Sequence, residues 1–217
     1  MRKKIIACMI VLAVAVAFMP VMSFAASKTV KMTVYNQVYK TGNTVYCGGA
    51  KGLYKVTLKK GKVKKAKVLC KYASLFGAYS YIGGIKKKGK YIYFTAGSEG
   101  TYWTIMRVKT SGKGLKRLAG ISTSEYVIKG KKIYYVDYDW DDDEKELYYS
   151  MKLNGRSKHR TSTKVKMTTK RSNAAKYRVI MKEYKGYAYD YLKTPKGTFF
   201  LGKVIIEESD YWEDDEY

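Results

Sequence analysis

Gly-Lys-Lys-Ile-Tyr-Tyr-Val-Asp, at residues 130–137, is the stretch that decides the fold. Its glycine favours a tight turn, because glycine reaches positive φ without a steric penalty. The Ile, Tyr and Val that follow are strand-forming residues. A second such stretch, Tyr-Tyr-Ser-Met-Lys-Leu at 148–153, ends at Asn154-Gly155. The unit therefore predicts two strands, of which the first begins after a hairpin turn at Gly130 and the second ends at a turn at Asn154-Gly155.

The same unit recurs along the chain. Each copy has a glycine turn, an Ile/Val-Tyr strand and a second apolar strand, and the lead glycines of the first three copies are 47 and 41 residues apart. The first copy contains Thr-Gly-Asn-Thr-Val-Tyr (41–46) and Leu-Tyr-Lys-Val (53–56). The second contains Lys-Gly-Lys-Tyr-Ile-Tyr (88–93), Ile-Met-Arg-Val (105–108) and Leu-Lys-Arg-Leu (115–118). The stretch quoted above is the third copy, and a degenerate fourth copy begins with Lys-Gly-Tyr-Ala-Tyr (185–189). The degenerate copy lacks the second apolar strand motif.

A period of about 40 residues with about four strands per unit is typical of propeller blades. We therefore expect an all-β fold of β-propeller-like antiparallel meanders, about four units in residues 26–206. A closed four-bladed ring, an open array that dimerises, and a meander that only imitates blades are the alternatives. Residues 28–35 alternate Val30, Met32 and Val34, and are expected to complete the last unit beside the C-terminal strands.

These units resemble two families of propeller repeats. Tyr93-Phe94-Thr95 and Tyr134-Tyr135-Val136-Asp137 are similar to the Tyr-Trp-Thr-Asp strand of the low-density-lipoprotein-receptor-like propellers. The pairing of residues 130–137 with 148–155 more closely resembles the secreted bacterial DUF5050 or TolB-like β-propeller repeats. The resemblance covers about residues 37–165 well and 176–206 poorly. It implies a ligand-binding or protein-binding platform and supplies no catalytic residue.

The first 25 residues have the pattern of a secretory signal peptide. Arg2, Lys3 and Lys4 precede an apolar run from Ile5 to Met19, and small residues stand three and one before a cut after Ala25. The run is shorter than the roughly 20 residues of a spanning helix, so cleavage is expected rather than an uncleaved anchor. No later segment is long and apolar enough to span a membrane, so we expect a secreted or cell-wall-associated protein.

Charge is strongly segregated along the expected mature chain. Without the leader, 40 basic groups face 18 acidic ones, a formal net charge of +22. Seven acids lie between Asp137 and Glu146, and seven more lie in the acidic tail at 207–217. The remaining surface is cationic and should attract polyanions in a salt-dependent way. The alternative is a solvated lysine surface that keeps strand edges soluble.

These features favour a binding or scaffold module at the cell envelope, engaging an anionic cell-wall polymer or another exported protein. Lysines outnumber arginines by 36 to 7, and nucleic acid is not expected as the physiological partner. The alternative function is a carbohydrate-active or other extracellular enzyme, which would need paired carboxylates in a cleft. No catalytic motif and no cofactor signature is present, so neither is expected.

Three smaller features are candidate sites. Asp137, Asp139, Asp141 and Asp143 alternate as Ca²⁺ ligands could, although the EF-hand glycine and final glutamate are missing. Cys47 and Cys70 could form a disulfide in an exported protein, or remain two free thiols. His159 is expected to be a surface histidine.

Aromatic residues beside lysines could stack sugars or bases, although alternate tyrosines more often pack between blades. The tail is expected to lie outside the core. It is either a solubilising segment or one that folds over a lysine-rich face and competes with polyanions.

Overall fold

The computed structural model describes residues 29–33, 38–72, 75, 81–97, 103–122, 125–139, 145–168 and 176–205. Every regular element within these ranges is a β-strand, which confirms the all-β prediction. The described residues include no helix long and apolar enough to cross a membrane. The expected signal peptide and the acidic tail lie outside the described residues.

Three four-stranded antiparallel sheets follow the three strong copies of the repeat. In each sheet the strands pair in chain order, so each is a meander like a propeller blade. The first sheet contains β2 (Val38–Thr41), β3 (Thr44–Gly49), β4 (Gly52–Lys59) and β5 (Lys62–Lys71). The second contains β6 (Tyr81–Lys88), β7 (Tyr91–Gly97), β8 (Trp103–Lys109) and β9 (Lys116–Ile121). The third contains β10 (Tyr126–Lys129), β11 (Lys132–Asp139), β12 (Lys145–Lys152) and β13 (His159–Arg160).

The degenerate copy forms a fourth, three-stranded sheet of β15 (Arg178–Tyr184), β16 (Tyr187–Thr194) and β17 (Gly197–Ile205). Its third strand forms as β17 although the sequence motif for that strand is absent. Among the described residues, no fourth, outermost strand follows β17 in this sheet. The lead glycines turn the first strand of each sheet into the second, and all four have positive φ: 52° at Gly42, 57° at Gly89, 60° at Gly130 and 72° at Gly186.

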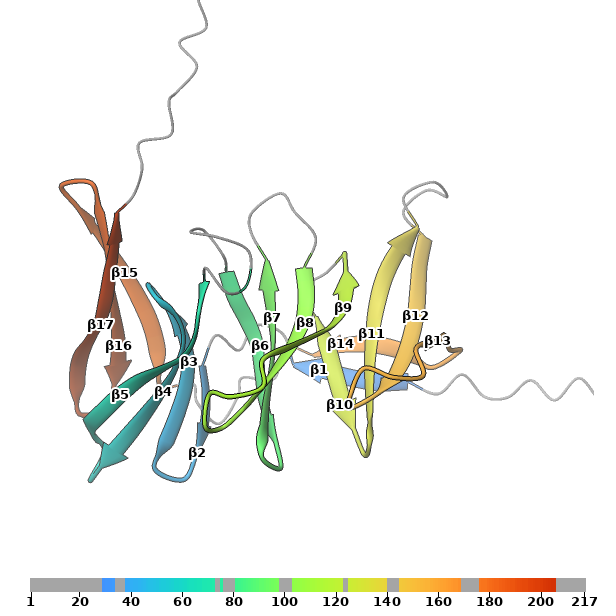
Figure 1. Ribbon diagram of the computed structural model, residues 1–217, viewed down its shortest axis with the longest axis horizontal. Coiled ribbons are helices and arrows are strands. Elements are labelled where there is room, and N and C mark those ends of the chain that lie inside the picture. Colours follow the sequence, from blue (N-terminus) through green and yellow to red (C-terminus); the bar gives the residue numbers. More distant parts are fainter. Residues whose placement is uncertain are drawn as a thin grey trace, which may run out of the picture.

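The sheets stand side by side in a row, in the order fourth, first, second, third (Figure 1). The chain therefore builds the first three sheets in sequence and then returns to place the fourth beside the first. The fourth and third sheets lie at opposite ends of the row, so the array is open and the expected units do not close into a ring in this structure.

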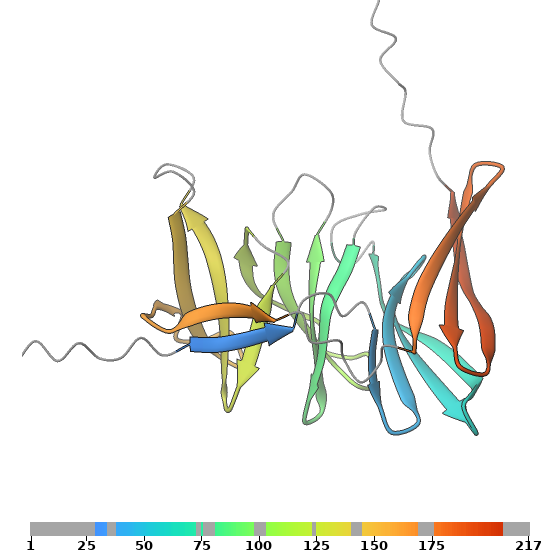
Figure 2. The ribbon, with the colours of Figure 1, turned by 180° about the vertical axis from the view of Figure 1, so that it is seen from behind.

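A parallel two-stranded ribbon lies behind the third sheet in Figure 1 and in front of it in Figure 2. It pairs β1 (Thr29–Thr33) with β14 (Lys164–Thr168). The prediction that residues 28–35 complete the last unit is therefore wrong. The physical reason lies in β14, where Val165 packs against Val127 of the third sheet and the strand edge pairs with β1.

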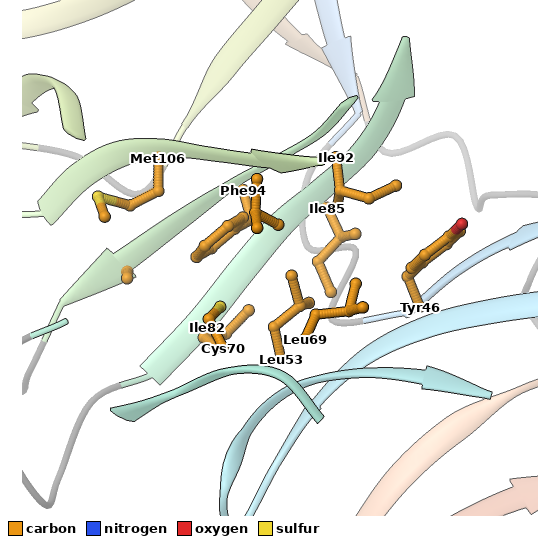
Figure 3. Packing of buried hydrophobic residues seen from close by; sticks show 11 residues of the cluster. Tyr46, Leu53, Leu69, Cys70, Ile82, Ile85, Ile92, Phe94 and Met106 are labelled. Carbon is orange, nitrogen blue, oxygen red and sulfur yellow. The ribbon is translucent and has the colours of Figure 1, made fainter. Parts of the chain in front are cut away.

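Apolar clusters join each sheet to its neighbour. Between the first and second sheets, Leu53 and Leu69 face Ile85, Ile92 and other apolar side chains (Figure 3). A second cluster joins the second and third sheets, and a third cluster joins the first and fourth. Each interior sheet is thus covered on both faces, as a blade within a propeller is.

Candidate binding face

The fourth sheet packs only one of its faces on the first sheet. Leu192 and Leu201 are buried there against Val45 and Val56, and the Tyr54 hydroxyl donates to the Leu201 carbonyl over 3.1 Å. An added Cβ at Gly202 would lie 2.9 Å from the Tyr54 hydroxyl, so a larger residue there would have to displace the Tyr54 side chain. Asp190 is also on this inner face, and burial raises the pKa of its carboxyl. The packing fixes which strand positions point outward.

The other face of this sheet, which we call the open face, carries the alternate positions of the same strands. Strand register puts Tyr184 opposite Tyr187 and Tyr191 opposite Phe200. The exposed fraction is 62% for Tyr184, 47% for Phe200 and 65% for Ile205. The positions that share this face are Arg178, Ile180, Lys182, Tyr184, Tyr187, Tyr189, Tyr191, Lys193, Thr198, Phe200, Lys203 and Ile205.

Four rings on the open face form a continuous row. The ring centroids of Tyr187 and Tyr189 are 6.2 Å apart, those of Tyr189 and Phe200 are 6.3 Å apart, and those of Phe200 and Tyr191 are 5.5 Å apart. These separations are within the range of favourable aromatic contacts. A strand surface holds the rings in place, so they offer a rigid apolar platform to a flat ligand.

Ammonium groups flank that row. Lys203 Nζ lies 4.1 Å from the ring centroid of Tyr187 and 6.0 Å from that of Tyr189, while Lys182 Nζ lies 5.8 Å from that of Tyr191. Cation–π attraction of this kind contributes about 0.5–1 kcal/mol at an exposed site. None of the described side chains on the open face is acidic, so the platform combines apolar rings with uncompensated positive charge.

The candidate Ca²⁺ residues are only partly placed. Asp137 and Asp139 lie on β11, whereas Asp141 and Asp143 lie outside the described residues. The Asp137 carboxylate accepts hydrogen bonds from the backbone N–H of Ser122, over 2.9 Å, and from its hydroxyl. Among the described residues no three His, Cys, Asp or Glu side chains gather as metal ligands. Asp137 therefore connects β11 to Ser122, the residue that follows β9 of the second sheet.

The disulfide between Cys47 and Cys70 is not formed, and both residues are buried free thiols. The two side chains point to opposite faces of the first sheet. Cys47 packs in the cluster shared with the fourth sheet, whereas Cys70 packs in the cluster shared with the second sheet. Burial raises the pKa of Cys47 to about 12 and that of Cys70 to about 11. Strand β4 separates β3 from β5, so the disulfide would require the sheet to be rebuilt.

His159 is exposed on β13, as expected. Its Nδ1 donates to the Ser157 carbonyl over 2.9 Å, and its Nε2 is hydrogen-bonded with the Ser150 hydroxyl over 3.0 Å. Ser150 is only 1% exposed, so this hydroxyl is not presented to a substrate. The pair joins β12 to β13 and is a structural contact.

Tyrosines at alternate strand positions lie in two different environments. Tyr46, Tyr93 and Tyr135 are buried between sheets, which confirms for these residues the prediction that alternate tyrosines pack between blades. Tyr187, Tyr189 and Tyr191 instead lie on the open face. Sequence reasoning missed this face as a site. The signal available was three tyrosines at alternate positions, 187, 189 and 191, but the alternation alone does not say which face is covered.

No family model matches the chain, and no curated protein matches it either. Among solved structures, oligopeptidase B from Leishmania major is similar over 82% of this chain, at 12% sequence identity and a TM-score of 0.39. A structure from a study of two prolyl endopeptidases is similar over 79% of this chain, at 13% identity and a TM-score of 0.41. The chain spans 29% and 30% of the length of those proteins. The similarity is distant and concerns the fold alone.

Proposed function

We propose that the mature chain is an exported binding module of the cell envelope and that its open face engages an anionic cell-wall polymer. The observation that carries the proposal is the row of four contacting rings flanked by Lys182 and Lys203, with no acidic side chain among the described residues of that face. Rings stack on flat apolar surfaces, and ammonium groups attract phosphate or carboxylate. The net charge of +22 adds a long-range attraction.

The proposal extends to family and compartment. We assign the repeat to the DUF5050 or TolB-like group of secreted propeller repeats, on the three glycine-turn and Ile/Val-Tyr motifs in phase. Export rests on the positively charged, apolar leader with a small-residue cut after Ala25. Mass spectrometry of the protein recovered outside the cells should find an N-terminus at Ala26. Retention of residues 1–25 would contradict it.

The function is binding rather than catalysis. The described open face offers phenol, phenyl and ammonium groups, but not the pair of carboxylates that a glycoside hydrolase needs. Binding by rings and lysines needs no cofactor and no metal ion. An exported protein partner with an acidic surface is the alternative that the same face would accept.

The test compares two charge reversals of equal size. Lys182→Glu with Lys203→Glu alters the open face, and Lys131→Glu with Lys132→Glu is the matched control at the exposed end of the third sheet. Binding to purified teichoic acid is measured at about 50 and about 500 mM salt. The native protein should lose most of its affinity at high salt. The open-face variant should lose about tenfold more affinity than the control at low salt. Equal losses, or salt-independent binding, would contradict the proposal.

A further inference from the structure

The open face is an apolar sheet face with no described element packed on it. Phe200 and Ile205 expose about half or more of their surface there. Soluble proteins usually cover such surfaces or use them for interaction. An occupant of this face has to match both its aromatic rings and its positive charge.

A second copy docked through the same face is disfavoured by charge. A symmetric contact would oppose the basic residues Arg178, Lys182, Lys193 and Lys203 of one copy with the same residues of the other. Like charges brought together in an interface cost free energy. A matching occupant therefore carries negative charge and aromatic groups.

The chain itself supplies such a segment immediately after β17. Residues 207–217 hold seven acids, no base, and the aromatic residues Tyr211, Trp212 and Tyr217. Ile205, the last described residue, is paired with Tyr187 and shares the open face with it. The segment thus starts at the edge of the face that it complements in charge and in apolar character.

The lengths also agree. From Ile205 back to Thr198 the face extends over eight residues of β17, or about 26 Å at 3.3 Å per residue. Residues 207–209 are enough for a reversal, and residues 210–217 would span about 26 Å if extended. A returning segment would therefore reach the whole row from Tyr187 to Tyr191.

We infer that residues 207–217 dock on the open face of their own chain, with the acids of the segment beside Lys182 and Lys203 and its aromatic side chains on the row of rings. Tethering gives the segment an effective concentration in the millimolar range without any additional contact. An exposed electrostatic contact of this kind is screened by salt. It can therefore be displaced by a polymer with many charges.

The consequence for polymer binding rests on the proposed function. The docked segment occupies the surface that the anionic polymer would use, so it acts as an internal competitor. The docking itself stands apart from the polymer and is tested without it.

The test is zero-length carbodiimide cross-linking of the mature full chain, which joins lysines to carboxylates in direct contact. Equal amounts of light and heavy-isotope protein are mixed, and linked peptides are identified by mass spectrometry. We expect links from Lys182 or Lys203 to the acids of residues 213–216, within a single copy and lost at high salt. Links between light and heavy copies, links spread equally to Lys131 and Lys132, or no link from the segment would overturn the inference.

A second measurement separates docking from function. In one variant all seven acids of residues 207–217 are replaced by Gln or Asn, which keeps the length and the aromatic residues. This variant and a deletion of residues 207–217 should bind teichoic acid about tenfold more tightly than the native protein at low salt, with an unchanged melting temperature. Tighter binding without cross-links would overturn docking and leave the proposed function standing. Cross-links without any polymer binding would leave docking standing and overturn the proposed function. A deletion variant that fails to fold would show that the segment is part of the core and overturn the inference.

Discussion

The outer faces of the third and fourth sheets occupy the two ends of one row and are built on the same strand pattern. At the third sheet the β1–β14 ribbon lies against that face, and Val127 is only 6% exposed beside Tyr134 and Val165. At the fourth sheet the corresponding face is open, and Phe200 is 47% exposed. One end therefore contributes to stability, whereas the other presents rings and lysines to solvent.

The difference shows that alternation of apolar and polar residues does not by itself decide what a strand face does. A covered face contributes through burial, at about 25 cal/mol per Å² of apolar surface. An open face of similar composition contributes little to folding and remains available to a ligand.

The largest effect should come from placing a charge on each face in turn. Val127→Asp buries a carboxylate under the ribbon and should lower the free energy of unfolding by about 3 kcal/mol. Phe200→Asp on the open face should change it by less than about 0.5 kcal/mol. Chemical denaturation of the two variants measures both values. Similar losses would mean that the open face contributes to folding stability as much as the face under the ribbon does.

Alkaline pH should weaken the covered faces of the first sheet. Burial raises the pKa of Cys47 to about 12 and that of Cys70 to about 11, from an ordinary value of 9.0. Above about pH 9 the unfolded chain ionises these thiols while the folded chain keeps them protonated, so stability falls as pH rises. The loss is at most about 1.4 kcal/mol per pH unit for each thiol. Denaturation at about pH 9 and 10.5 should show a larger fall in the native protein than in the double variant Cys47→Ala with Cys70→Ala, because every other titrating group is common to both proteins. An identical fall in that double variant would contradict the assignment.

Removing single rings should separate binding from stability. Tyr189→Ala and Phe200→Ala should each weaken binding to teichoic acid, because each removes a ring whose apolar surface the polymer would cover, at about 25 cal/mol per Å² of apolar surface buried. Their melting temperatures should stay close to that of the native protein. Tyr148→Ala, on the outer face of the third sheet, is the control and should leave binding unchanged. Unchanged affinity in all three variants would show that the row of rings is not the binding site.

The smallest effect concerns a cation between the second and third sheets. Lys86 Nζ donates to the Tyr126 carbonyl over 3.0 Å, and burial lowers its pKa to about 8 from 10.5. Below about pH 8 the folded protein carries a poorly solvated ammonium group, and this cost is relieved as pH rises from 8 towards 10.5. The free energy of unfolding should therefore increase between about pH 8 and 9, by at most about 1.4 kcal/mol, below the pH at which the thiols of the unfolded chain ionise. In Lys86→Met the increase should disappear, and persistence of the increase would assign it to another group.

Much of the local structure could be predicted from particular residues. Gly42, Gly89, Gly130 and Gly186 each form the predicted turn, because a two-residue hairpin needs positive φ and glycine provides it. The weak fourth copy was predicted from the same turn, although β17 carries no recognisable strand motif. The open face could not be predicted, since Tyr187 alternates as Tyr134 does and only the neighbour differs.

The β-strands, the repeating unit and the separation of charge follow from the amino-acid sequence alone, because turns, strand propensity and charge are local properties of the chain. The return of the fourth sheet to the first, the parallel pairing of β1 with β14 and the placement of Cys47 and Cys70 on opposite faces are known only from the folded structure. These features depend on contacts between residues far apart in the sequence. Such contacts are selected by the burial of complementary apolar faces, and no local pattern specifies which faces will meet.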